Sequence, residues 1–230
     1  MPIRAILFDL DGTLLDTMAD IHRALNRALE EHQMSAISPQ ECRTLVGWGA
    51  RRLITAALPE AHRQDEKLVE RIQESFGRWY RQYPVVESTP YPGIMALIDD
   101  LSTQRDIALG ILSNKPDDLV QQVVPQAFPE HPFAIVRGAS EAHPHKPDPT
   151  AAQDMIHRLG STPEHTLFLG DSAVDMETAR GVGCYALGAA WGYRPAEELI
   201  AAGADRLCAT APEAHGAITA WITQKNTEGE

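Results

Sequence analysis

The sequence predicts an α/β fold in which helices cover both faces of a doubly wound parallel sheet, with a helical domain inserted into it. Two patterns favour this fold. From about residue 93 onward, apolar strand-like segments alternate with amphipathic segments of helical length, which is typical of parallel crossover units. Between the first strand and that region, about 70 residues show helical spacing alone.

The first element is the apolar run over residues 3–8, which is rich in strand formers and is followed at once by the turn-forming cluster Asp9-Leu10-Asp11-Gly12-Thr13. From Asp16 to about Glu87 no strand pattern is found, so this segment is predicted to be helical. Its apolar residues recur at helical spacing in two places, first as Met18, Ile21, Leu25, Ala28 and Leu29, and later as Leu68, Val69, Ile72, Phe76, Trp79, Tyr80 and Tyr83.

After the segment Thr89-Pro90-Tyr91-Pro92-Gly93 the pattern alternates. Helices are predicted near 93–104, 117–127, 149–159 and 173–181, with a closing helix at the end of the chain. Strands are predicted at 107–112, near 133–136, at 165–169 and 184–187, and near 206–208. This order predicts a Rossmann-like α/β core formed by residues 1–15 and 88–230, with residues 16–87 inserted after the first strand as a helical cap domain.

Composition and charge exclude several classes of function. The chain has 230 residues, of which 43% are hydrophobic and 23% charged, as in globular proteins. With 20 basic and 32 acidic residues, its formal net charge of -12 has the wrong sign for a broad surface that binds nucleic acid. No apolar run approaches the ~18 residues of a membrane span, and no secretory signal precedes the first strand. We therefore expect a cytoplasmic protein without nucleic-acid or membrane partners.

Carboxylates stand at the carboxyl ends of the predicted strands, where ligands bind in open parallel sheets. Asp9 and Asp11 are two residues apart in an extended segment, so their side chains point to the same side. Asp171 ends a strand that is expected to lie beside them. Because two unit charges about 4 Å apart repel by about 4 kcal/mol at an effective dielectric near 20, three converging carboxylates favour a bound cation or a retained proton. Oxygen ligands without nearby His or Cys favour Mg²⁺ over zinc.

A hydroxyl and an ammonium group complete the predicted site. Ser113 follows the second strand of the core and Lys146 lies in a proline-bounded loop, and both can hold the oxygens of a phosphoryl group. Asp175, four residues after Asp171, is expected on the same face of a starting helix. There it can pair with Lys146 or with a metal-bound water, or it can complement the helix dipole. Any one of these residues alone has an ordinary loop or surface interpretation, but their coincidence at four strand ends favours a site.

Four segments closely resemble, in order, the signature segments of the haloacid dehalogenase superfamily, and the resemblance spans nearly the whole chain. The segments are Phe8-Asp9-Leu10-Asp11-Gly12-Thr13-Leu14, Ser113-Asn114-Lys115, Lys146-Pro147 and Gly170-Asp171-Ser172-Ala173-Val174-Asp175. The resemblance implies that Asp9 is the nucleophile and Asp11 the general acid and base. It implies phosphate binding by Ser113, Asn114 and Lys146. It further implies that Asp9, the Asp11 carbonyl and Asp171 bind Mg²⁺. Asp175 then lies next to these ligands without binding the ion directly.

Asp11 distinguishes two branches of the superfamily. Dehalogenases that resemble this chain lack an acid at the position of Asp11, whereas the phosphotransferases have one, because an alkoxide leaving group needs a proton and a halide does not. The resemblance therefore implies phosphoryl transfer. Asp9 attacks phosphorus, an aspartyl-phosphate forms, and a water that Asp11 deprotonates hydrolyses it.

The segment Leu45-Val46-Gly47-Trp48-Gly49-Ala50-Arg51-Arg52-Leu53, between two predicted cap helices, is similar to the specificity loop of phosphoglycolate phosphatases. Asn26 and Tyr91-Pro92-Gly93 share this similarity. Gly47 and Gly49 allow the backbone to turn tightly and approach a ligand. Trp48 or Arg51 can then reach the non-reacting end of a small substrate, and Arg51 can bind a carboxylate bidentately. The alternative is that Trp48 packs within the cap and that Arg51 is an exposed helix charge.

Three functions remain open at this point. The leading one is a magnesium-dependent phosphatase, monomeric or homodimeric, for a small phosphorylated metabolite, with 2-phosphoglycolate as the best named substrate. A phosphosugar mutase of the beta-phosphoglucomutase kind uses the same core, and release of inorganic phosphate distinguishes the two. A catalytically silent binding protein on this scaffold is disfavoured by the intact set of Asp9, Asp11, Ser113, Lys146 and Asp171.

Overall fold

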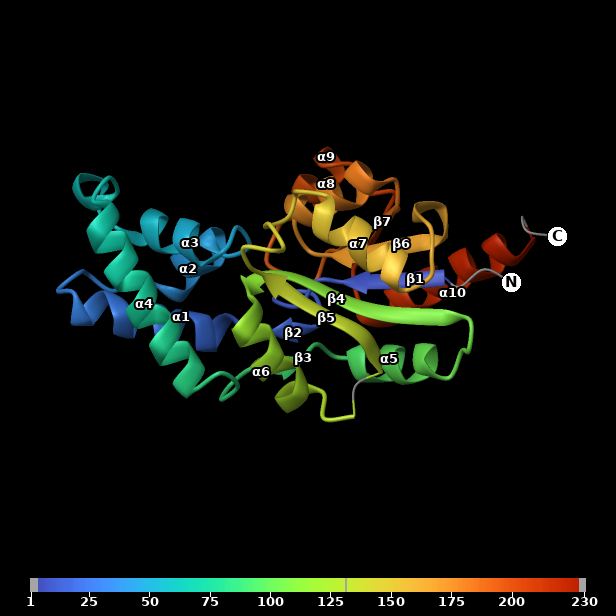
Figure 1. Cartoon of the computed structure of the whole chain (residues 1–230), viewed down its shortest axis with the longest axis horizontal. Helices are drawn as coiled ribbons and strands as arrows, with labels where there is room; N and C mark the ends of the chain where they lie inside the picture. Colours follow the sequence, from blue (N-terminus) through green and yellow to red (C-terminus); the bar gives the residue numbers. More distant parts are fainter. Residues whose placement is uncertain (1–3, 131, 228–230) are drawn as a thin grey trace.

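A six-stranded parallel sheet forms the centre of the computed structural model, which describes residues 4–130 and 132–227. The strand order is β5-β4-β1-β6-β7-β8 (Figure 1). Each neighbouring pair is parallel, so the predicted doubly wound sheet is confirmed; residue 3 of the predicted first strand lies outside the described residues. The strands are β1 (Arg4–Phe8), β4 (Ile107–Pro116), β5 (Phe133–Ala139), β6 (Thr166–Gly170), β7 (Tyr185–Ala189) and β8 (Arg206–Cys208).

Helices cover both faces of this sheet (Figure 1). One face packs against α5 (Ile94–Ser102), α6 (Asp117–Ala127) and α10 (Ala211–Thr227), and the other against α7 (Thr150–Arg158), α8 (Ala173–Val182) and α9 (Ala196–Ala201). Strand β1 shows why the layers form. Its side chains alternate, with Ile6 and Phe8 in one hydrophobic cluster and Ala5 and Leu7 in the other. All four are fully buried, as expected for a central strand of a parallel sheet.

The four helices between β1 and α5 form a separate layered unit at one end of the molecule (Figure 1). We call them the cap helices: α1 (Met18–Glu31), α2 (Pro39–Leu45), α3 (Ala50–Ala57) and α4 (Glu66–Gln82), with a short 3₁₀ turn at Glu60–His62. Their apolar faces share one hydrophobic cluster, to which Leu119 and Tyr193 contribute from outside the unit. Ser38 and Asp65 cap α2 and α4 by accepting hydrogen bonds from Glu41 N and Leu68 N.

Three short elements were not predicted from the sequence. β2 (Leu15–Asp16) and β3 (Thr89–Pro90) pair antiparallel where the chain enters and leaves the cap helices, and α9 lies between β7 and β8. Two residues are too few to show strand alternation, and six are too few to define a helical period. All three elements depend on tertiary packing rather than on a local pattern.

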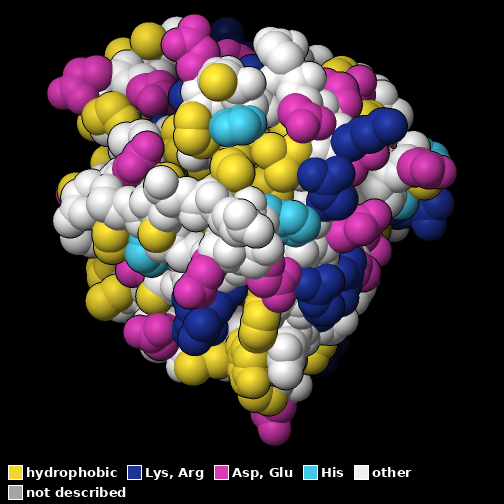
Figure 2. All heavy atoms as spheres, turned by 90° about the vertical axis from the view of Figure 1, so that its left-hand side faces the viewer, with side chains coloured by type: hydrophobic (Ala, Val, Ile, Leu, Met, Phe, Trp, Pro, Cys, Tyr) yellow, Lys and Arg dark blue, Asp and Glu magenta, His cyan; other side chains and the backbone are white. Residues whose placement is uncertain are grey.

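Among the residues with described structure, no helix is long and apolar enough to cross a lipid bilayer. Figure 2 shows the end of the molecule that the cap helices form. Acidic and basic side chains are interspersed there, so this face carries no extended field of one sign.

Candidate active site

The carboxyl ends of three neighbouring strands bring the predicted site residues together. Asp9 directly follows β1, Ser113 lies near the end of β4, and Asp171 directly follows β6. These strands are adjacent in the order β4-β1-β6, and parallel pairing places their carboxyl ends at one edge. Asp9, Asp11 and Ser113 line a single cavity between this edge and the cap helices.

Asp9 is oriented by two donors on one oxygen. Its Oδ1 accepts a hydrogen bond from the Leu10 backbone N–H at 2.7 Å and lies 2.9 Å from Lys146 Nζ. Burial raises the pKa of Asp9 to about 7, an effect that Lys146 opposes and Asp175 strengthens. The two donors fix the direction of the carboxylate, while Oδ2 can approach a ligand in the cavity.

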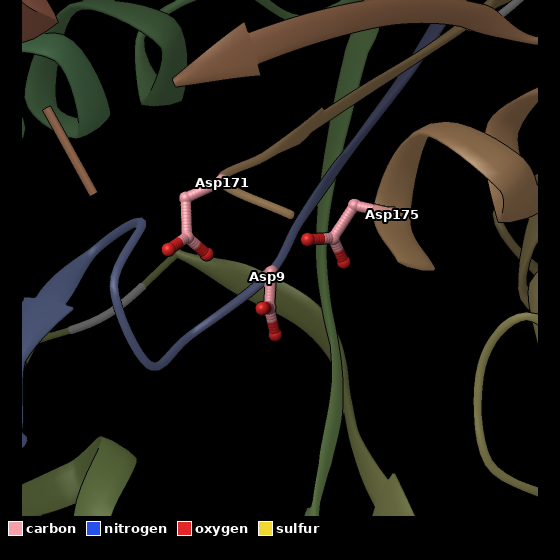
Figure 3. Close-up of side chains that lie close together, drawn as sticks. All are labelled: Asp9, Asp171 and Asp175. Atoms are coloured by element: carbon pink, nitrogen blue, oxygen red, sulfur yellow. The ribbon is translucent and has the colours of Figure 1, made fainter. Parts of the chain in front are cut away.

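The carboxylates of Asp171 and Asp175, from two other elements, converge with that of Asp9 (Figure 3). One ligand oxygen from each of Asp9, Asp171 and Asp175 lies within 4.8 Å of the others, and all three residues are buried. Burial, together with the charges of Asp175 and Asp9, raises the pKa of Asp171 well above its usual value. Lys146 offers one positive charge to these three carboxylates, so an all-oxygen donor set with excess negative charge remains, which fits Mg²⁺. The cluster contains Asp9 and Asp171 of the predicted ligands, with Asp175 as its third member in place of Asp11.

The backbone around Asp171 is shaped to admit its side chain. The carboxylate accepts hydrogen bonds from Thr13 Oγ1 at 3.2 Å and from Tyr193 N at 2.7 Å. Gly12 has a φ of +90°, and a Cβ there would lie 2.3 Å from Asp171 Oδ2. A Cβ on Gly192 would lie 2.2 Å from Asp171 Cβ. Both positions therefore require glycine if this carboxylate is to face Asp9.

Lys146 and Asp175 form a buried pair behind Asp9. Lys146 Nζ donates to Asp175 Oδ1 at 2.6 Å, and the side chain of Asp175 is fully buried. The other oxygen, Oδ2, accepts from Ser172 N at 3.1 Å and from Ser172 Oγ at 2.6 Å, which completes the capping box of α8. Of the alternatives that the sequence leaves open for Asp175, the structure shows pairing with Lys146 and helix capping together.

Asn114, a predicted phosphate-binding residue, is bonded to backbone groups in this structure. Its Oδ1 accepts from Lys146 N at 2.7 Å, and its Nδ2 donates to Lys146 O at 3.1 Å and to Gly47 O at 3.0 Å. Asn114 thus connects the Lys146 loop to the loop between α2 and α3. Its direct contact with a phosphate stays a prediction.

Asp11 lines the cavity and is held by two side chains, those of Thr17 and Lys115. Thr17 Oγ1 donates to Asp11 Oδ1 at 2.7 Å. Lys115 Nζ lies 2.8 Å from Oδ1 and 2.9 Å from Oδ2, and it also donates to the Tyr80 hydroxyl at 2.7 Å. Asp11, to which the resemblance gives the role of general acid and base, is therefore ion-paired with Lys115. Lys115 in turn contacts Tyr80, which belongs to the cap helix α4.

The loop between α2 and α3 approaches the core closely, but the arginines that follow it in α3 have partners outside the cavity of Asp9. A Cβ on Gly49, whose φ is +87°, would lie 2.6 Å from His145 Nε2, so glycine is required for this approach. Trp48 stacks on the Arg52 guanidinium at 4.4 Å, and Arg51 pairs with Glu66 at an exposed position. Trp48 and Arg51 line an outer cavity with His145 and Lys146, whereas Gly47 and Gly49 line the one that contains Asp9.

Asn26, the other cap residue in the phosphoglycolate phosphatase resemblance, fastens a loop. Its Oδ1 accepts from Ile37 N at 3.0 Å and its Nδ2 donates to Ile37 O at 3.0 Å. This reciprocal pair holds the connection between α1 and α2. In this structure the contacts of Asn26 are made within the cap helices.

The sequence reasoning placed Lys115 in a signature segment but gave it no role, and it did not single out Tyr80 or Tyr193 as site residues. Lys115 carried a signal, because it is two residues beyond Ser113 in an extended strand and therefore projects to the same side. Tyr80 and Tyr193 carried none, since Tyr80 is one apolar position of a helix among several. Tyr193 supports the site from another loop, where its hydroxyl accepts from Thr17 N at 2.9 Å.

Comparison with known proteins agrees with this geometry. Residues 6–189 match the sequence profile described as haloacid dehalogenase-like hydrolase. The chain is 32% identical to the phosphoglycolate phosphatase of Aquifex aeolicus over 191 residues, 83% of this chain and 86% of that protein. It is also 32% identical to the phosphoglycolate phosphatase of Vibrio cholerae, over 88% of this chain and 91% of that protein.

A solved structure shows the same fold. It is the crystal structure of a Lactobacillus delbrueckii subsp. bulgaricus protein that is provisionally named a phosphoglycolate phosphatase, with a TM-score of 0.86 and 30% identity, covering 95% of this chain and 99% of that one. The parallel sheet, the acidic centre at its strand ends and these similarities together indicate a hydrolase with a Rossmann-like α/β core. More specifically, the chain belongs to the haloacid dehalogenase-like hydrolase family.

Proposed function

We propose that this hydrolase is a magnesium-dependent phosphatase that cleaves a small phosphate monoester, with 2-phosphoglycolate as the substrate, through an aspartyl-phosphate on Asp9. The observation that carries the proposal is the convergence of Asp9, Asp11 and Ser113 on one cavity. The similarity to two phosphoglycolate phosphatases supports the choice of substrate. We further propose that residues 16–87 act as a cap over a core of residues 1–15 and 88–230.

The ion would be held by Asp9 and Asp171, with the Asp11 carbonyl as the third ligand that the family resemblance implies. Bound there, Mg²⁺ supplies positive charge that offsets the two carboxylates and the phosphoryl oxygens. Asp175 contributes by holding Lys146, since its Oδ1 lies 2.6 Å from Lys146 Nζ. The Lys146 ammonium, 2.9 Å from Asp9 Oδ1, and the Ser113 hydroxyl then hold the phosphoryl group as charge spreads over its oxygens.

The chemistry divides between two aspartates. Asp9 attacks phosphorus as the ester oxygen leaves with a proton from Asp11, and an acyl phosphate forms on Asp9. Water then attacks that phosphorus, its proton passes to Asp11, and Asp9 is restored as inorganic phosphate leaves. Thr17 orients Asp11 for both steps, because its hydroxyl donates a hydrogen bond to the Asp11 carboxylate.

The cavity favours a small substrate over a phosphosugar. Its wall away from Asp9 is formed by the apolar side chains Ile21, Val46, Ala50, Leu53, Phe76 and Leu119. Sugar hydroxyls buried against such a wall would lose hydrogen bonds to water without replacement, at a cost of about 1–3 kcal/mol for each unpaired group. We therefore prefer the phosphatase to the phosphosugar mutase.

A panel of phosphate esters with and without added Mg²⁺ tests this function. We expect stoichiometric release of inorganic phosphate from 2-phosphoglycolate, faster than from an aryl phosphate, and loss of that activity in excess chelator. Conversion of a sugar 1-phosphate into its 6-phosphate without phosphate release would instead favour the mutase. No turnover of any ester, with or without the ion, would contradict catalysis by this site.

A further inference from the structure

The cavity that contains Asp9 has one basic side chain in its described lining. Asp9, Asp11 and Ser113 lie at the catalytic end, and Lys115 and Tyr80 lie between that end and the apolar wall of the cap helices. Lys115 is the only Lys or Arg among the residues that line this cavity within the described part of the chain. A ligand held at Asp9 by its phosphoryl group would therefore extend past Lys115.

Lys115 is built into the site by three contacts. Its side chain is 3% exposed and lies between Asp11 and Tyr80, at 2.8 Å from Asp11 Oδ1 and 2.7 Å from the Tyr80 hydroxyl. The ammonium also lies 4.4 Å from the centre of the Tyr80 ring. A charge in such a dry setting interacts more strongly with an entering anion than a surface charge does.

The other Lys and Arg side chains near the site have partners outside the part of the cavity that Lys115 faces. Lys146 contacts Asp9 and Asp175 at the phosphoryl end. Arg51 pairs with Glu66 in the exposed outer region. Arg43 and Arg194 donate to backbone carbonyls where the cap helices meet the core, at Gly192 and Val46. Lys115 is thus the cation best placed to meet the end of a substrate that does not react.

We propose that Lys115, assisted by the Tyr80 hydroxyl, is the specificity-determining residue that binds the carboxylate of a small phosphorylated acid. On entry, that carboxylate replaces Asp11 as the ion-pair partner of Lys115, and Asp11 keeps its hydrogen bond to Thr17 Oγ1 at 2.7 Å. The apolar wall beyond Tyr80 has no side-chain hydrogen-bonding group for a longer polar substrate. This proposal rests on the phosphatase function above and deepens it by assigning how the acid is recognised.

Two substrates that differ in one group test the proposal. Ethyl phosphate has the carbon chain of 2-phosphoglycolate with a methyl group in place of the carboxylate. For each variant, the ratio of kcat/KM for 2-phosphoglycolate to kcat/KM for ethyl phosphate is measured. Lys115→Met should lower this ratio by about 10- to 100-fold, the range expected for a lost charge-assisted hydrogen bond. Lys67→Met, at an exposed position of α4, is the matched control and should leave the ratio unchanged.

The ratio separates recognition from support of Asp11. If Lys115 serves only to orient Asp11, then Lys115→Met lowers kcat/KM for both substrates by the same factor, and that result overturns the proposal. Tyr80→Phe keeps the buried ring and removes one hydroxyl, so it also serves if Lys115→Met fails to fold. We expect it to lower the ratio several-fold, and an unchanged ratio in this variant would overturn the assisting role.

Calorimetric titration in the Asp9→Asn background provides a readout without turnover. Addition of Lys115→Met should weaken binding of 2-phosphoglycolate by at least about tenfold and leave binding of ethyl phosphate nearly unchanged. Equal binding of 2-phosphoglycolate with and without Lys115 would overturn the proposal even in an active enzyme. By contrast, a protein that binds 2-phosphoglycolate through Lys115 but hydrolyses no ester would contradict the proposed function and leave this inference standing.

Discussion

The Asp20 carboxylate accepts hydrogen bonds from both the backbone N–H of Ser88, at 2.9 Å, and the Ser88 hydroxyl, at 2.5 Å. Asp20 lies in the first turn of α1 and Ser88 lies just before β3, so this contact joins the two segments that connect the cap helices to the core. The same carboxylate accepts from Val86 N at 3.0 Å and Glu87 N at 3.1 Å. The buried Asp20 carboxylate therefore holds together the segment by which the chain enters the cap helices and the segment by which it leaves them.

Asp20→Asn should destabilise the protein by about 2 kcal/mol at pH 7, because an amide group replaces an acceptor that faces several buried donors. Burial by itself would raise the pKa of Asp20, but the hydrogen bonds from Ser88, Val86 and Arg23 outweigh it and lower that pKa. A depressed pKa in the folded state stabilises the protein above the unfolded value, about 3.9, and this contribution is lost as the pH falls through the folded value. The difference between wild type and Asp20→Asn in urea unfolding should therefore shrink below about pH 4.

Asp99→Asn is the control for that measurement, since Asp99 is exposed on α5. It should change the urea midpoint little at either pH. An Asp20→Asn penalty of equal size at pH 7 and pH 3 would contradict the assigned charge of Asp20.

Asp9→Asn should lower phosphate release by about 10⁴-fold or more, because an amide of similar shape is a poor nucleophile. The fold should survive, since burial already raises the pKa of Asp9 to about 7 and removal of its charge relieves repulsion from Asp175. Steady-state phosphate release and thermal unfolding measure the two effects. Substantial activity in a verified Asp9→Asn sample would refute the aspartyl-phosphate course.

Gly192→Ala should displace Asp171, because the added Cβ would lie 2.2 Å from Asp171 Cβ and 2.5 Å from Gly12 O. We expect the Mg²⁺ concentration for half-maximal activity to rise by about tenfold or more, as for loss of a supporting contact at a metal site. Gly216→Ala is the matched control, because nothing lies within 4 Å of its added Cβ in α10. That change should leave the Mg²⁺ requirement unaltered and stabilise the helix by up to about 1 kcal/mol.

Arg194→Ala should loosen the contact between the cap helices and the core. Arg194 donates to Thr44 O at 2.7 Å and Val46 O at 2.6 Å, while Arg43 donates in the opposite direction to Gly192 O at 2.5 Å. Loss of two such bonds should speed hydrogen exchange at the amides of residues 46–50 by about tenfold or more. Arg71→Ala, at an exposed position of α4, should leave exchange there unchanged; equal exchange in Arg194→Ala and wild type would refute the role of this contact.

Arg51→Ala addresses the cap residue that the sequence favours for carboxylate binding. Because Arg51 is 47% exposed and paired with Glu66 outside the cavity of Asp9, its loss should change the preference for 2-phosphoglycolate over ethyl phosphate by less than about twofold. The free energy of unfolding should fall by less than about 1 kcal/mol, as for an exposed ion pair. A large drop in substrate preference would restore Arg51 to the site and imply that the loop moves when substrate binds.

The core elements could be predicted because each is encoded by a local pattern. The apolar runs that became β1, β4 and β6 are buried on both faces, and the amphipathic repeats of α1 and α4 each bury one face. The pairing of β2 with β3 and the short helix α9 could not be predicted, since their stability comes from neighbours distant in sequence.

The sequence alone determined which residues gather at the strand ends of the candidate site. Asp9, Ser113 and Asp171 each stand at the end of a parallel strand, and the topology of such a sheet carries strand ends to one edge whatever the details of packing. The tertiary structure alone decided which cation faces the rest of the cavity. Arg51 and Lys115 are both plausible from their positions in the chain, but the packing of α4 against the core buries Lys115 between Asp11 and Tyr80 and leaves Arg51 in solvent with Glu66. Burial and partner are properties of the folded surface, so no local pattern could have distinguished these two side chains.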